Sequence, residues 1–162
     1  MALTGILLDT NAYSAYKVGA PEAVDIVQHV HRIYISPIVL GELLGGFLIG
    51  SKQDENLKDL LLFLKSPRIK ILPIDDTIAS HYAAIYNSLR ARGKPIPTND
   101  MWIAATALRH NIGVLMNVSF CSSANACCNS SCVFITIGPY HATGSLIGLP
   151  ETRMNRIPSS PA

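Results

Sequence analysis

The chain has 162 residues, 49% of them apolar, which is the length and composition of a single domain with a sizeable core. Its formal net charge of +2 is too small to indicate nucleic-acid binding by itself, so any such surface would need a local arrangement of basic residues. The first residues contain no basic leader, and their apolar stretch is shorter than that of a signal peptide. We therefore expect a cytoplasmic protein.

Charge and cysteine are distributed unevenly along the chain. Of its 13 basic and 11 acidic side chains, only Glu151, Arg153 and Arg156 lie beyond residue 115. All four cysteines fall in this same tail, which is rich in Ser, Asn, Gly and Pro and shows no sustained helical or strand periodicity. We therefore divide the chain into a domain over residues 1–115 and a divergent, low-charge tail over 116–162 that we expect to be poorly ordered.

Predicted strands and helices alternate over the first 115 residues, which favours an α/β fold with a parallel sheet and helices on both faces. Short apolar runs predict strands over 5–8, 33–35, 69–72 and 113–116. Helical spacing and first-turn prolines predict helices over 12–17, 21–31, from 36 onward, 54–65, 75–92 and 98–111. Thr98 or Asn99 is expected to cap the last of these helices.

Three carboxylates stand where an ordinary surface position is hard to assign. Asp9 ends the first apolar strand, Glu42 is the only charge between Ser36 and Gly50, and Asp100 lies in the first turn of a helix. In an open parallel sheet, ligands gather at the carboxyl ends of the strands, so we expect these three side chains to meet at that edge. Hard divalent cations prefer oxygen ligands, and the sequence therefore predicts a Mg²⁺ or Mn²⁺ site.

Each carboxylate also has a structural interpretation. Asp9 could cap the helix that begins near Ala12, and Asp100 could simply favour its helix dipole by about 0.3–1 kcal/mol. Glu42 discriminates best between the two interpretations, because an unpaired carboxylate among apolar neighbours is costly to bury. Independent caps would not be expected to converge, so the three residues together favour a functional site.

Three segments of the chain carry a family resemblance: Leu7-Leu8-Asp9-Thr10-Asn11, Ser36-Pro37-Ile38-Val39-Leu40-Gly41-Glu42-Leu43 and Asn99-Asp100-Met101-Trp102-Ile103-Ala104-Ala105. In this order and setting they resemble the PIN-domain ribonucleases, most closely the VapC-like toxins of toxin–antitoxin pairs. The resemblance covers residues 1 to about 115. It implies a three-layer PIN-like fold whose last helix and strand we expect to be lost or disordered in this chain.

The resemblance also implies an activity, namely hydrolysis of RNA phosphodiester bonds with Mg²⁺ or Mn²⁺ held by Asp9, Glu42 and Asp100. Thr10 or Asn11 would orient a water molecule or the phosphate. A cognate antitoxin and a homodimer are the partners that it implies. A basic cluster formed by Arg90, Arg92 and Lys94 is a candidate RNA contact, although cations at a helix C-terminus explain it equally well.

PIN domains usually bring a further acidic residue shortly after the fourth strand, where this chain has Ser119. Its absence puts catalysis in doubt, so a catalytically impaired PIN-fold remnant or binding module is the alternative function. The fall in charge near this point suggests a hypothesis: the reading frame shifted near codon 116. Inspecting the other two frames for a charged segment with the missing acid tests it.

Two other interpretations of the tail are rejected. Its cysteines include no Cys-x-x-Cys pair, so neither zinc binding nor a disulfide framework is expected. The uncharged run 133–149 is shorter than a membrane span and contains Gly138 and Pro139, so we expect no contact with a membrane.

Overall fold

The sheet of the computed structural model contains four parallel strands and one antiparallel strand, in the order β3-β2-β1-β4-β5. The structure describes residues 5–93, 96–117 and 132–135, the last as backbone only. The strands are β1 (Ile6–Leu8), β2 (Ile33–Ile35), β3 (Ile69–Ile71), β4 (Gly113–Asn117) and β5 (Cys132–Ile135). The helices are α1 (Thr10–Lys17), α2 (Pro21–His29), α3 (Pro37–Ile49), α4 (Gln53–Leu64), α5 (Asp76–Ala91) and α6 (Thr98–His110).

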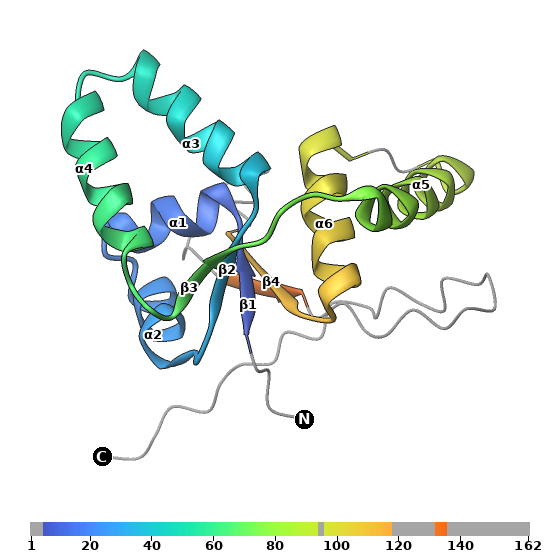
Figure 1. Ribbon diagram of the computed structural model, residues 1–162, viewed down its shortest axis with the longest axis horizontal. Coiled ribbons are helices and arrows are strands. Elements are labelled where there is room, and N and C mark those ends of the chain that lie inside the picture. The colour runs from blue at the N-terminus through green and yellow to red at the C-terminus, as the bar shows by residue number, and fades with distance from the viewer. Residues whose placement is uncertain (1–4, 94–95, 118–131, 136–162) are drawn as a thin grey trace, which may run out of the picture.

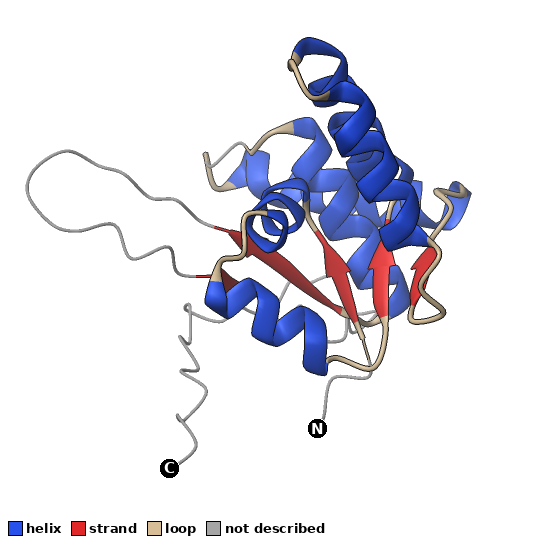
Figure 2. Ribbon diagram, turned by 90° about the vertical axis from the view of Figure 1, so that its left-hand side faces the viewer, coloured by secondary structure: helices blue, strands red, loops and turns tan. Residues whose placement is uncertain are grey.

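Helices lie on both faces of the sheet, as the sequence predicted (Figures 1 and 2). The helices α1, α2 and α4 lie on one side, and α5 and α6 lie on the other. The predicted α/β fold is therefore confirmed, with element boundaries within a few residues of those expected. Strand β5 is an addition, since no strand was predicted in the tail. Met116 and Asn117 of the tail belong to β4, whereas residues 118–131 and 136–162 lie outside the described residues. The predicted disorder of the tail and the division at residue 115 stay predictions.

The centre of the sheet is buried on both faces. Ile6, Leu7 and Leu8 of β1 are all 0% exposed, which explains why this strand is a continuous apolar run and not an alternating one. Ile6 pairs with Ile33 of β2, and Leu8 pairs with Leu115 of β4. Because β1 lies between two parallel neighbours, whatever follows Leu8 emerges at the middle of the carboxyl edge of the sheet.

Two helices begin with the side-chain caps that their sequences suggest. The Ser36 hydroxyl accepts a hydrogen bond from the Val39 N–H at the start of α3, and the Asp75 carboxylate accepts one from the Ile78 N–H at the start of α5. The expected cap of α6 by Thr98 or Asn99 is wrong. Within the described residues no side chain caps this helix, which begins at Thr98 with Pro97 before it.

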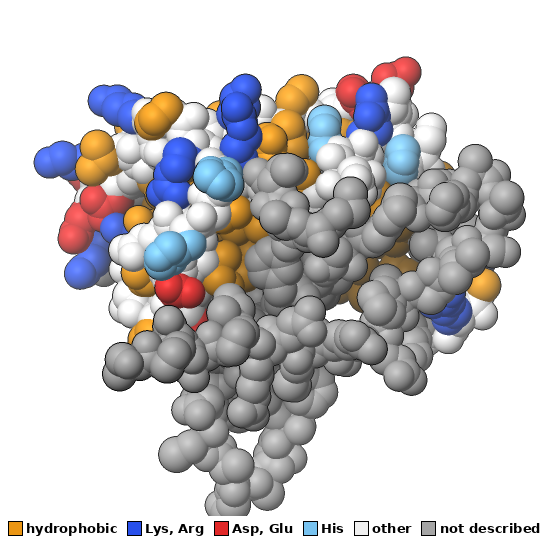
Figure 3. Space-filling view, turned by 90° about the horizontal axis from the view of Figure 1, so that it is seen from below, with side chains coloured by type: hydrophobic (Ala, Val, Ile, Leu, Met, Phe, Trp, Pro, Cys, Tyr) orange, Lys and Arg blue, Asp and Glu red, His pale blue; other side chains and the backbone are white. Residues whose placement is uncertain are grey.

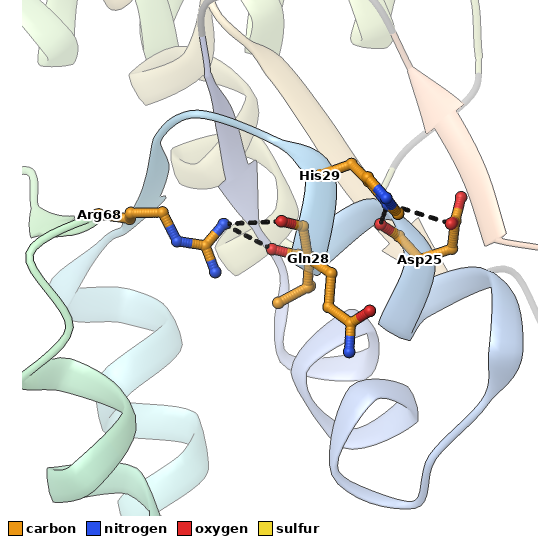
Figure 4. A network of polar contacts seen from close by, with 5 residues as sticks. Asp25, Gln28, His29 and Arg68 are labelled. Carbon is orange, nitrogen blue, oxygen red and sulfur yellow. Dashed lines mark hydrogen bonds and ion pairs between the residues drawn. The ribbon is translucent and has the colours of Figure 1, made fainter.

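The C-terminus of α2 is closed from a distant part of the chain. The guanidinium group of Arg68, in the loop before β3, donates hydrogen bonds from Nη1 to the carbonyl oxygens of Val27, Gln28 and Val30 at 3.1, 3.1 and 2.9 Å. Figure 4 shows Arg68 beside Gln28 at this end of the helix. The last carbonyl groups of a helix have no partner within it, so a cation at this point offsets both their unmet hydrogen bonds and the helix dipole. Arg68 thereby joins the C-terminus of α2 to the loop before β3.

We expect Arg68→Ala to lower the free energy of unfolding by about 1–2 kcal/mol, because three carbonyl groups lose a charged donor at a partly solvated site. Urea unfolding followed by circular dichroism measures the change. Arg32→Ala, which removes another exposed arginine, serves as the matched control. Equal stability of the two variants would show that Arg68 contributes no more than a surface charge.

Candidate functional site

The first of the three predicted site residues, Asp9, is fixed at the carboxyl edge of the sheet. Its N–H donates to the Leu115 carbonyl at 3.1 Å, which continues the pairing of β1 with β4 by one more residue. Its side chain is only 4% exposed. Asp9 occupies the N-cap position of α1, yet among the described residues it makes no side-chain capping hydrogen bond. Burial raises the pKa of Asp9 by more than the N–H groups of Thr10 and Asn11 lower it, so the start of α1 compensates only in part for burying this carboxylate.

Glu42 reaches the same edge from the second turn of α3 and is held by donors on two other helices. Thr10, the first residue of α1, donates from its hydroxyl to Glu42 Oε2. Asn99, in the first turn of α6, donates from Nδ2 to Glu42 Oε1 at 2.6 Å. The two donors lie 32 and 57 residues from Glu42 along the chain. Glu42 is thus the point where side-chain hydrogen bonds join α1, α3 and α6.

The third carboxylate, Asp100, lies beside Asn99 and interacts electrostatically with the other two. Burial raises the pKa of Asp100, and the negative charge of Glu42 raises it further. Burial is also the largest cause of the raised pKa of Asp9. The N–H groups at the start of α1 counteract this rise, whereas the charges of Asp100 and Glu42 add to it. Each aspartate is therefore harder to ionise because the other acids are near.

The donor chemistry of this edge fits a hard divalent cation. Asp9 is a nearly buried acid. The ion pairs in the described parts of the chain involve none of Asp9, Glu42 and Asp100. A divalent cation would neutralise carboxylates that destabilise one another's charge. Oxygen is also the ligand that Mg²⁺ and Mn²⁺ prefer. No group of three His, Cys, Asp or Glu side chains in residues 5–93 and 96–117 is already spaced as a metal cage. The acids thus lie within electrostatic reach without forming a finished coordination shell.

The other predicted site residues are dispersed. Asn11 is exposed in the first turn of α1, next to Thr10, whose hydroxyl is engaged by Glu42. Arg90 and Arg92 are exposed at the end of α5, where Arg90 Nη1 lies 3.5 Å from the Tyr86 hydroxyl oxygen, to which it donates. Lys94 and Ser119 lie outside the described residues. On the face of the molecule seen from below, basic and histidine side chains are scattered among apolar ones (Figure 3).

Asn99 is the residue of this site that sequence reasoning missed. It was expected to cap α6, but its amide donates to Glu42 of α3. The only signal was its position immediately before Asp100, since neighbouring residues in a first helical turn share one end of the helix. Nothing local to Asn99 indicates that α3 lies within hydrogen-bonding distance.

Comparison with known proteins agrees with this fold. The PIN domain family model matches residues 6–117. Ribonuclease VapC4 of Mycobacterium tuberculosis is 36% identical over 81 residues, which are 50% of this chain and 62% of that protein. Ribonuclease VapC1 of Rickettsia felis is 35% identical over 113 residues, covering 68% of this chain and 83% of that protein.

Solved structures with the same fold include VapBC2 from Rickettsia felis bound to a DNA fragment from their promoter. It superposes with a TM-score of 0.62 at 26% identity, over 70% of this chain and 87% of that one. VapBC-5 of Mycobacterium tuberculosis, a member of the VapBC family of toxin–antitoxin systems, has a TM-score of 0.53 at 26% identity, over 68% and 82% of the two chains.

The chain belongs to the PIN domain family. Within that family it is similar to VapC ribonucleases of toxin–antitoxin systems, which confirms the resemblance that the sequence carried. In the described residues no helix is long and apolar enough to cross a lipid bilayer.

Proposed function

We propose that the chain is a Mg²⁺- or Mn²⁺-dependent endoribonuclease that hydrolyses RNA phosphodiester bonds as the toxin of a toxin–antitoxin pair. The observation that carries this proposal is the electrostatic interaction among Asp9, Glu42 and Asp100. They come from three separate elements, and each aspartate has its pKa raised by another of the acids. Relatives named ribonuclease VapC support the reaction class.

Asp9, Glu42 and Asp100 are the residues that would hold the cation. A bound divalent ion supplies an activated water molecule and stabilises charge on the phosphate oxygens. Thr10 and Asn99 keep the carboxylate of Glu42 directed toward this edge through hydrogen bonds to its two oxygens. Asn11, exposed at the start of α1, would contact a phosphate, and the N-terminal dipoles of α1 and α6 favour negative charge at the same edge.

A cleavage assay with the intact chain tests the activity. Single-stranded RNA is incubated with the protein in Mg²⁺, in Mn²⁺, or in EDTA, and the products are separated by size. We expect cleavage with either metal and none in EDTA. If neither metal supports cleavage, the chain is a PIN fold without catalysis, the alternative that Ser119 suggests.

The antitoxin partner of this proposal fits an exposed apolar surface on the pair of helices α3 and α4. We define the α3–α4 surface by five large apolar side chains: Leu44, Leu48, Ile49, Leu61 and Leu62. They are 42%, 68%, 91%, 52% and 68% exposed. A hollow on α4 is lined by three leucines with charged residues around them: Leu57, Leu61, Leu62, Asp54, Lys58, Asp59 and Lys65. Exposed apolar area of this kind on one helix pair is typical of a protein interface.

We expect Leu48→Asp and Leu62→Asp each to weaken binding of the cognate antitoxin by at least about tenfold, because each places a charge in an apolar contact. RNA cleavage should be unchanged, because neither residue is among the predicted site residues. Affinity is measured by calorimetry with purified antitoxin, and Val18→Asp, at an 83% exposed position after α1, is the control. If the two variants leave antitoxin affinity unchanged but alter the mass of the isolated toxin in light scattering, this surface joins two copies of the chain.

A further inference from the structure

The hydrogen bond from Asn99 to Glu42 joins one of the three acids to a residue that is not itself an acid. The Nδ2–Oε1 distance is 2.6 Å, which is short for a nitrogen donor. Asn99 lies in the first turn of α6 and Glu42 in the second turn of α3, so the contact crosses between two helices that are far apart in sequence. Its formation depends on how α3 and α6 pack.

Glu42 has two carboxylate oxygens, and each is assigned to a different helix. Thr10 of α1 holds Oε2, and Asn99 of α6 holds Oε1. With one donor, a carboxylate can still rotate about its last torsion, which has a broad energy minimum. With donors on both oxygens that rotation is fixed, and the plane of the carboxylate is fixed with it.

Folding stability does not account for this arrangement. Asn99 is exposed, and in the described part of the chain it caps no helix. A hydrogen bond between an exposed amide and a half-exposed carboxylate contributes little net free energy, because water would satisfy both groups. Its effect is on orientation: it fixes Glu42 at the edge where Asp9 and Asp100 also lie.

We propose that Asn99 is a positioning residue that orients Glu42 for cation binding, acting together with Thr10. This inference rests on the proposed function, because it assigns Asn99 to the same metal site. Partners that hold a metal-binding carboxylate commonly alter metal affinity by tenfold or more when they are removed. Asn99 contacts Glu42 and not the cation, so its removal weakens binding without removing a ligand.

The experiment measures the dissociation constant for Mn²⁺ of the full chain by electron paramagnetic resonance of free Mn²⁺. We expect Asn99→Ala to bind Mn²⁺ about tenfold more weakly than the parent. Its melting temperature in EDTA should stay within about 2 °C of the parent, because little stability is lost. For RNA cleavage, kcat should fall while KM stays the same. Asn87→Ala, at an exposed asparagine of α5, is the matched control and should change neither affinity nor kcat.

A second variant tests the proposal even if Asn99→Ala fails to fold. Asn99→Leu keeps the branching and the number of heavy atoms of the side chain but removes the amide donor, and it should weaken Mn²⁺ binding to the same extent as Asn99→Ala. Unchanged Mn²⁺ affinity in both variants overturns the inference, and so does failure of both to fold, which would make Asn99 a structural residue. If the parent chain itself binds no Mn²⁺, the proposed function fails instead.

Discussion

Replacing Asp100 with asparagine is expected to reduce metal-dependent RNA cleavage by at least about 100-fold, the effect of removing one directed charge from a catalytic site. The change keeps the shape of the side chain and removes its negative charge. Asp100 is half-buried, and its pKa is raised by burial and then by Glu42, so it lies within electrostatic reach of the other acids. Without its charge, the site loses one of three anionic ligands for a divalent ion.

Asp76→Asn is the matched control, because Asp76 lies in the first turn of α5 as Asp100 lies in the first turn of α6. Both substitutions remove an acid from the positive end of a helix, so a loss of helix stability would be shared by the two variants. Initial rates are measured in saturating Mn²⁺ with a fluorescently labelled RNA. If Asp76→Asn and Asp100→Asn retain the same activity, Asp100 has no role beyond its helix.

Asp9→Asn is expected to raise the stability of the metal-free protein while it abolishes cleavage. Asp9 is 4% exposed, and its pKa is raised by burial and by the charges of Asp100 and Glu42, so its ionised form destabilises the fold. An amide of the same shape removes that charge. We expect a gain of about 1 kcal/mol, equal to roughly 2–4 °C in melting temperature for a chain of this size.

The gain should depend on pH in a defined direction. A carboxyl group whose pKa is higher in the folded chain binds its proton more tightly there, so its cost appears as pH rises above the ordinary aspartate pKa of 3.8. The cost is complete once the pH exceeds the raised value of the folded state. The melting temperatures of Asp9→Asn and the parent should therefore differ at pH 7 and converge as the pH falls toward 4.

Mn²⁺ should reverse this order of stability. A ligand that binds only the folded state stabilises it by about 2.7 kcal/mol at one hundred times its dissociation constant. The parent should therefore melt above Asp9→Asn in excess Mn²⁺ and below it in EDTA. Asp54→Asn, at an exposed position of α4, should show neither effect. A variant that is less stable than the parent in EDTA would mean that ionised Asp9 is satisfied by the protein alone.

Local patterns in the sequence were enough to predict the helices and the four parallel strands. Apolar runs such as Ile33 to Ile35, and Pro21 or Pro37 in a first turn, act through neighbours a few residues away, so their effect survives without knowledge of the fold. Strand β5 was not predicted, although its sequence is a short apolar run like those of the other strands, because it overlaps the longer uncharged run 133–149, which does not mark where a strand would end. Its pairing with β4 decides its conformation, and that pairing is not local.

In the candidate site, too, some features follow from local sequence and others depend on tertiary packing. The sequence by itself determined which residues carry the chemistry: Asp9 at the end of an apolar strand, Glu42 alone in an apolar helix, and Asp100 in a first turn. Only the tertiary structure decided that Thr10 and Asn99 hold the two oxygens of Glu42, across 32 and 57 residues of chain. A carboxylate in an unusual setting is visible locally, whereas a hydrogen bond between helices depends on the packing that brings α1, α3 and α6 to the same edge of the sheet.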